Sequence, residues 1–214
     1  MDERLLLLIN GTSSPYLDVL MVSISGKLIW VPLFLALAYA FYKNFGSKNL
    51  LIILAMLGLG LLVTDYLNSQ YLRPLIGRYR PCYILNPVYF DLRFPGGEGA
   101  GKYSFPSAHA ANFWLVTFFT LYCFRDHLLN IGMMFNTMLI CYSRVYLAAH
   151  YPGDILGGVL LAAVTSLCLI VVLKKRFQIK PVTKPVFTTY AALYISLVYV
   201  AVSLYAFSKL KDLF

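Results

Sequence analysis

Hydrophobic residues make up 60% of the 214-residue sequence, whereas charged residues make up only 13%. This composition excludes an ordinary soluble domain, and several apolar runs are long enough to span a bilayer. The 18 basic residues outnumber the 9 acidic ones, which gives a formal net charge of +9. Because the basic residues lie between apolar runs, we exclude nucleic acid as a partner and expect membrane topology and anion binding to account for the excess.

The first apolar stretches, residues 5–10 and 15–25, are each too short to span a membrane. We interpret them as interfacial or re-entrant helices. A first span is predicted over residues 28–42 and a second over 49–71, with a polar turn at 43–48 between them.

A long loop rich in Pro, Gly, Tyr and Arg is predicted over residues 72–105. The remaining predicted spans are a third from Ser107 to about Phe124, a fourth ending near Ala149, a fifth from Asp154 to Leu173 and a sixth over residues 187–207. The sequence therefore predicts an all-α fold, a polytopic membrane helix bundle of about six transmembrane helices preceded by short amino-terminal interfacial helices. We expect residues 1–214 to form a single domain.

Six spans place the 72–105 loop and the junction between the fourth and fifth spans on one side of the membrane. Short loops on the opposite side contain eight basic residues: Lys43, Lys48, Arg125, Lys174, Lys175, Arg176, Lys180 and Lys184. The positive-inside rule then places this opposite side in the cytoplasm and the 72–105 loop outside it.

Three polar motifs occur at the ends of these predicted spans. They are Arg73-x6-Arg80-Pro81, Pro106-Ser107-Ala108-His109, and Ser143-Arg144-x5-His150-x3-Asp154. Guanidinium groups suit phosphate because their planar donors bind two oxygens at once. A His with a carboxylate in reach keeps one ring nitrogen available for chemistry. Together the motifs indicate a phosphate site that contains a nucleophile.

The three motifs, in this order, resemble the signature K-x6-R-P, P-S-G-H and S-R-x5-H-x3-D of the type 2 phosphatidic acid phosphatase superfamily. The signature lies within residues 73–154. The resemblance implies an integral-membrane phosphoric ester or diphosphate hydrolase, which acts through a phosphohistidine and needs no metal or other cofactor.

Residue roles follow from the same resemblance. His150 matches the nucleophile, Asp154 the residue that orients it, and His109 the general acid that protonates the leaving oxygen. The phosphate-binding positions of the family correspond to Arg73, Arg80, Ser107, Ala108 and Arg144. Two residues depart from the family pattern: Arg73 replaces Lys, and Ala108 replaces Gly.

Other polar residues near the motifs have two interpretations each. Asp65 either pairs with a nearby Arg, which we favour, or takes part in catalysis. Arg78 either meets Asp65, which we favour, or binds a second phosphate or a lipid headgroup. Ser143 either packs between helices or contributes to the site.

A site at the membrane boundary suits a phosphate carried on a lipid of the surrounding bilayer. Our first interpretation is undecaprenyl diphosphate, and lipid A or phosphatidylglycerophosphate is the alternative. A bacterial inner membrane with the site facing the periplasm is the expected location. A non-enzymatic lipid-binding or transport protein is the competing class, and haloperoxidase chemistry is disfavoured by the spans.

Overall fold

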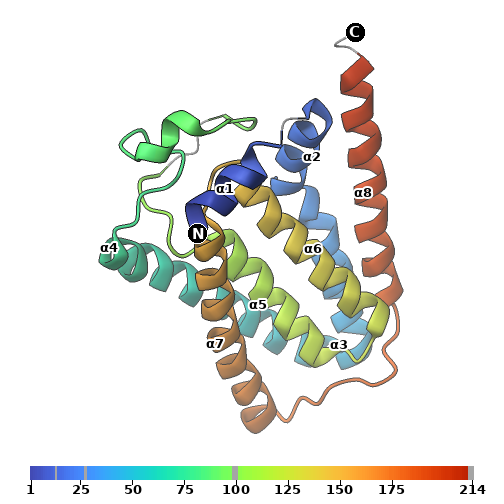
Figure 1. Cartoon of the computed structure of the whole chain (residues 1–214). Helices are drawn as coiled ribbons and strands as arrows, with labels where there is room; N and C mark the ends of the chain where they lie inside the picture. Colours follow the sequence, from blue (N-terminus) through green and yellow to red (C-terminus); the bar gives the residue numbers. More distant parts are fainter. Residues whose placement is uncertain (13, 27, 98–100, 212–214) are drawn as a thin grey trace.

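The computed structural model describes residues 1–12, 14–26, 28–97 and 101–211, and over this part the chain forms helices joined by loops (Figure 1). The longer helices are α1 (Asp2–Asn10), α2 (Pro15–Ser25), α3 (Val31–Tyr66), α5 (Ala108–Cys123), α6 (His127–Tyr146), α7 (Pro152–Arg176) and α8 (Thr188–Lys211). Shorter turns are η1 (Leu28–Trp30), η2 (Leu67–Leu72), α4 (Arg73–Ile76) and η3 (Pro87–Asp91). The all-α prediction is confirmed for these residues.

The number of spans is lower than predicted when length and composition are the criteria. Among the described residues, three stretches are long and apolar enough to cross a membrane: Leu28–Ile76, Pro152–Arg176 and Thr188–Lys209. The bent pair α1 and α2, at 116°, makes a fourth if it is counted as one span. Six spans are therefore not confirmed. One reason is that α5 has only 16 residues, a length of about 24 Å against a hydrocarbon core of about 30 Å.

The first two predicted spans belong to one helix, α3. The polar turn predicted between them, at residues 43–48, is therefore not a separate loop. The turn is helical apart from Gly46, whose φ of 77° and ψ of 171° break the helix. Glycine adopts this φ without the steric cost that other residues have. Beyond the break, the chain stays helical to Ile76, so Arg73 lies on a helix and not in the predicted loop.

The predicted short amino-terminal helices are present, and α1 lies across the ends of α6 and α7 (Figure 1). Asn10, at the end of α1, is buried, and its Nδ2 donates hydrogen bonds to the carbonyl oxygens of Tyr146 at 2.7 Å and Arg93 at 2.9 Å. The backbone N–H of Arg93 donates to Asn10 Oδ1 at 2.8 Å. One amide side chain therefore ties the first helix to α6 and to the long loop.

Helices α5 and α7 approach closely because two adjacent glycines face α5. A Cβ at Gly158 would stand 2.6 Å from the carbonyl oxygen of Ser107 and 2.8 Å from Cβ of Ala110. A Cβ at Gly157 would stand 2.5 Å from the ring of Phe105. The glycines thus allow the N-terminus of α5 to lie against the first turns of α7, which brings the second and third motifs together.

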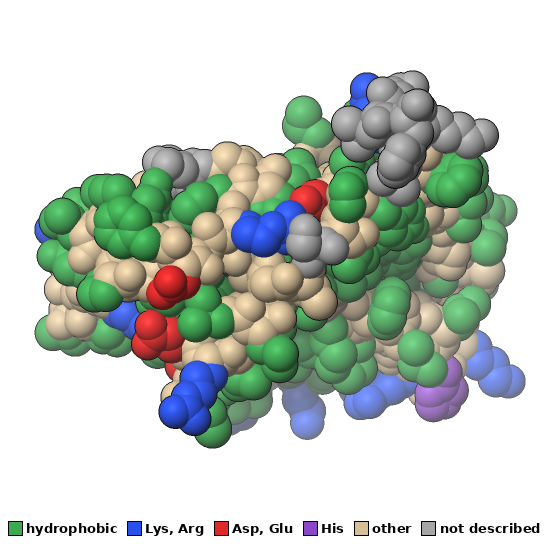
Figure 2. Space-filling model, turned by 45° about the horizontal axis from the view of Figure 1, so that its top comes forward, with side chains coloured by type: hydrophobic (Ala, Val, Ile, Leu, Met, Phe, Trp, Pro, Cys, Tyr) green, Lys and Arg blue, Asp and Glu red, His purple; other side chains and the backbone are tan. Residues whose placement is uncertain are grey.

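The basic loops gather at the end of the bundle away from the motifs. The N–H of Arg125 donates to the carbonyl of Val182 at 2.9 Å, and Asn44 Nδ2 donates to the carbonyl of Val186 at 2.8 Å. These bonds join the bend of α3, the α5–α6 connection and the α7–α8 loop, and the eight basic residues counted above lie in or beside these three regions. Figure 2 shows a surface made mainly of hydrophobic side chains, with Lys and Arg side chains along its lower edge.

Candidate active site

The third motif occupies the tight turn between α6 and α7. Helix α6 ends at Tyr146, Ala148 takes a φ of 55°, and α7 begins at Pro152. Proline suits the first helical position because its fixed φ is helical and its missing N–H needs no partner there. Asp154 lies, as predicted, in the first turn of α7, and its Oδ2 accepts a hydrogen bond from the N–H of Tyr151 at 2.8 Å.

His150 and Asp154 face each other in the interior. Nδ1 of His150 lies 3.5 Å from Oδ2 of Asp154, and the side chains are only 1% and 0% exposed. This separation is longer than an ordinary N–H···O bond. The carboxylate therefore stands beside Nδ1, while its shorter hydrogen bonds go to other groups. The arrangement leaves Nε2 as the ring nitrogen that does not face Asp154.

Burial keeps the imidazole of His150 neutral. It lowers the pKa of His150 to about 4; Asp154 opposes this shift, and the positive charges of Arg80 and Arg144 add to it. As the pH falls from about 6.5 towards 4, His150 therefore binds a proton in the unfolded chain but not in the folded chain. The free energy of unfolding therefore decreases as the pH falls from about 6.5 to about 4. Near neutral pH the ring remains unprotonated.

Asp154 has a second ionic partner, Arg78, which the sequence analysis paired with Asp65. Nη1 of Arg78 lies 3.1 Å from Oδ1 of Asp154, and Nη2 lies 2.6 Å from Oδ2 of Asp2. The guanidinium carbon also lies 3.8 Å from the centroid of the Tyr151 ring. The favoured pairing of Arg78 with Asp65 is therefore wrong, because Arg78 is held by two other carboxylates.

The second motif begins α5 beside this network. The N–H of Ser107 donates to the carbonyl of Asp154 at 2.9 Å, and its Oγ accepts from the N–H of Ala110 at 3.4 Å, which caps the helix. Ala108 is the first residue of α5, and its φ is negative. The change from Gly to Ala at this position therefore needs no left-handed conformation. His109 follows in the first turn of α5.

Arg80 of the first motif and Arg144 of the third lie within electrostatic reach of His150. Nε of Arg80 donates to the carbonyl of Tyr103 at 3.1 Å, and burial lowers its pKa. Nη1 of Arg144 donates to Oγ of Ser25, at the end of α2. Arg73 lies within electrostatic reach of Arg80 and Asp154. Nε of Arg73 and Nε of Arg144 are buried without a hydrogen-bond partner.

Ser143 is buried, and its hydroxyl donates to the carbonyl of Ile140 at 2.7 Å. This contact within α6 matches the packing interpretation. Asp65 forms no ion pair within 4 Å among the described residues, but it lies within electrostatic reach of Arg73, so the favoured partnership with a nearby Arg holds only at longer range. Asp65 instead lines a groove together with Ala108 and His109.

Three residues that support the site were missed by the sequence interpretation. Asp2 accepts from Arg78 and, at 2.8 Å, from the N–H of Gly153. Asn86 Nδ2 donates to the hydroxyl of Tyr151 and to the carbonyl of Arg80, each at 2.9 Å. Ser25 accepts from Arg144. All three lie outside the motifs, and their only sequence signal is that they are polar residues near apolar stretches.

Among the described residues, no group of three or more His, Cys, Asp or Glu side chains is placed to hold a metal ion. The positive charge around His150 comes from guanidinium groups. Their forks supply the hydrogen-bond donors that a phosphate needs.

Comparison with known proteins identifies the family of the chain. The model of the PAP2 superfamily matches residues 49–178. A lipid A 4'-phosphatase of Bacteroides thetaiotaomicron is 36% identical over 160 residues, which cover 75% of this chain and 71% of that protein. A lipid A 4'-phosphatase of Porphyromonas gingivalis is 33% identical over 160 residues, which cover 74% of this chain and 66% of that protein. No solved structure matches.

The chain belongs to the PAP2 superfamily and is a phosphoric ester hydrolase of that family. The all-helical fold, the apolar helices and the paired His150 and Asp154 agree with this membership. The matched region includes all three motifs.

Replacing Arg78 with Gln removes the cation that faces the buried carboxylate of Asp154. A hydrogen bond to a charged group contributes about 2 kcal/mol, and a buried carboxylate that loses its partner is costly. We expect Arg78→Gln to lower the free energy of unfolding by about that amount, measured by urea unfolding in detergent micelles. Arg4→Gln is the control, because Arg4 is exposed on α1. Equal stability of Arg78→Gln and the wild type would contradict the assignment.

Proposed function

We propose that the chain is an integral-membrane lipid phosphatase in which His150 attacks the phosphorus atom of a lipid phosphate. The observation that carries this proposal is the buried, neutral His150, placed beside Asp154 and within electrostatic reach of Arg80 and Arg144. A neutral imidazole has a lone pair to offer, whereas a protonated one does not. The neighbouring guanidinium groups stabilise the negative charge of the phosphate as the reaction proceeds.

In the first step, Nε2 of His150 forms a bond to phosphorus, and the bond from phosphorus to the lipid oxygen breaks. His109, in its protonated form, gives its proton to the departing oxygen. Arg73, Arg80 and Arg144 hold the other phosphate oxygens. The backbone N–H groups of Ala108 and His109 lie at the N-terminus of α5, which favours an anion. Asp154 stabilises the positive imidazolium that forms at His150.

In the second step, water attacks the phosphohistidine. His109, now neutral, takes a proton from the water as the new oxygen–phosphorus bond forms and the nitrogen–phosphorus bond breaks. His150 returns to its neutral form, and inorganic phosphate leaves. In both steps guanidinium groups supply the positive charge, and His109 first gives a proton and then regains one from the attacking water, so neither step is routed through a metal or other cofactor.

For the substrate we propose a lipid A phosphate. Two relatives more than 30% identical to the chain carry the name lipid A 4'-phosphatase. This similarity favours the alternative in our sequence interpretation over the first choice, undecaprenyl diphosphate. The proposal also includes a single membrane domain over residues 1–214.

We test the reaction and the substrate with the detergent-purified protein and a panel of lipid phosphates: a lipid A phosphate, undecaprenyl diphosphate, phosphatidic acid and phosphatidylglycerophosphate. The expected result is phosphate release that is fastest from the lipid A phosphate and at least about a thousandfold slower in His150→Ala, because the mutant lacks the attacking nitrogen. His127→Ala is the control, since His127 lies at the opposite end of the bundle. A His150→Ala protein with near wild-type activity would exclude the proposed nucleophile, and faster release from undecaprenyl diphosphate would restore the first choice of substrate.

For the membrane topology we propose about six transmembrane segments in a bacterial inner membrane, with the site facing the periplasm. The two halves of α3, separated at Gly46, count as two segments in this arrangement, and α5 and α6 complete the set although they are short or polar. The support is the gathering of basic loops at the end away from the motifs.

The topology is tested by attaching a membrane-impermeant maleimide to single cysteines introduced at Lys180 and Glu3, with the four native cysteines replaced. In spheroplasts, we expect the cysteine at position 3 to react and the cysteine at position 180 to react only after the membrane is permeabilised. Labelling at position 180 without permeabilisation would overturn the orientation.

A further inference from the structure

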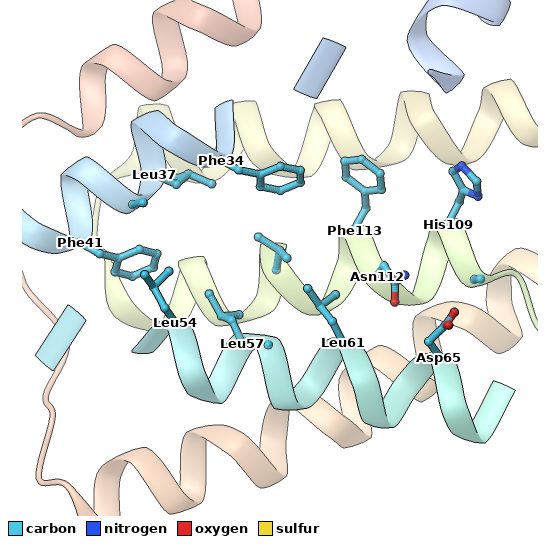
Figure 3. A pocket seen from close by; sticks show the side chains of 14 residues that line it. Phe34, Leu37, Phe41, Leu54, Leu57, Leu61, Asp65, His109, Asn112 and Phe113 are labelled. Carbon is cyan, nitrogen blue, oxygen red and sulfur yellow. The ribbon is translucent and has the colours of Figure 1, made fainter. Parts of the chain in front are cut away.

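An apolar groove runs from the second motif between the two halves of α3. Its volume is about 560 Å³, which lies in the range of about 300–1,000 Å³ found for small-molecule sites. Of the fourteen residues that line it, three are polar: Asp65, His109 and Asn112. Figure 3 shows these three at one end of the groove and Phe41 and Leu54 at the other. The groove therefore has a polar end at the proposed general acid and a long apolar remainder.

The apolar part fits a hydrocarbon chain that enters from the bilayer. Phe34 and Leu54 line the groove and are 39% and 41% exposed, while Leu37 and Phe41 are nearly fully buried. The lining thus passes from the lipid-facing surface to the protein interior. Because His109 lines the same groove, a chain in this position is attached to a headgroup whose phosphate ester lies at the active site.

The polar end carries one acceptor and one donor from facing helices. Asp65 lies on α3, is exposed and lines the groove. It forms no ion pair within 4 Å among the described residues, and Arg73 lies within its electrostatic reach. Asn112 lies on α5, and its Oδ1 accepts from the hydroxyl of Thr64 at 3.1 Å. This bond fixes one end of the Asn112 amide and leaves Nδ2 to donate. An ionisable side chain in an apolar helix is expensive to place and usually marks a site.

We propose that Asp65 and Asn112 recognise an amide that links an acyl chain to the phosphate-bearing headgroup. The chain lies in the groove, so the group that joins it to the headgroup lies between these two side chains. An amide has an N–H for the Asp65 carboxylate and a carbonyl for Asn112 Nδ2, whereas an ester has no donor. Combined with the lipid A phosphate proposed above, this makes the substrate class an N-acylated amino-sugar phosphate. This inference rests on the proposed function and adds the residues that select the substrate.

The test compares two synthetic substrates that differ in one linkage. Both are acylated glucosamine phosphates in the same detergent micelles; one has its chain on an amide nitrogen, and in the other an ester replaces that amide. For the wild type, we expect kcat/KM for the amide substrate to exceed that for the ester by about tenfold. In Asp65→Leu and in Asn112→Leu, kcat/KM for the amide substrate should fall to the value for the ester substrate, mainly because KM rises. For the ester substrate, kcat/KM should change by less than about threefold.

The control is Asp91→Leu, which removes an exposed carboxylate at the end of η3, outside the groove. The ratio of kcat/KM for the amide substrate to that for the ester substrate should be the same in Asp91→Leu as in the wild type. Equal losses on both substrates in Asp65→Leu, or a displaced pH profile, would overturn the proposal, because Asp65 would then act through His109 or through the fold. Unchanged preference in both variants would overturn it as well. Failure of the wild type to hydrolyse either sugar phosphate, with release from another lipid phosphate, would instead reject the lipid A proposal and this inference with it.

Discussion

One buried carboxylate, that of Asp154, joins the parts of the site. Its oxygens accept from the N–H of Tyr151 and from Arg78, and Oδ2 stands 3.5 Å from Nδ1 of His150. Its backbone carbonyl accepts from the N–H of Ser107. Each of the three motif regions is therefore tied to the first turn of α7. A carboxylate that is 0% exposed is tolerated only because its hydrogen-bonding capacity is used in this way.

The electrostatic consequence appears at His150. Guanidinium groups attract a phosphate, and by the same field they disfavour a proton on a nearby imidazole. Burial has the larger effect in the same direction. The features that suit the site to an anion thus also keep the imidazole in the form that can attack it. The close approach of α5 to α7 at Gly157 and Gly158 places the second motif within this environment.

The sequence predicted the helices and the motif cluster because both have local signals. Apolar runs and a Pro-Gly pair before Asp154 locate α7, and Ser107 marks the start of α5. The number of spans was harder to predict, because a single Gly46 divides α3 while the residues around it remain helical. The supports from outside the motifs could not be predicted either. Asp2 meets Arg78 across 76 residues of sequence, and only the three-dimensional packing of α1 over α7 brings the pair together.

The central claim is that His150 is a neutral imidazole in the folded protein. The chain has three histidines, so selective ¹⁵N-histidine labelling and an NMR pH titration in micelles would resolve each of them, and His150→Gln would identify the relevant signal. The account predicts that this signal keeps the neutral form down to about pH 5 and titrates near a pKa of about 4. A signal for His150 that titrates at about 6.5 or above, the ordinary range of an exposed imidazole, would contradict it.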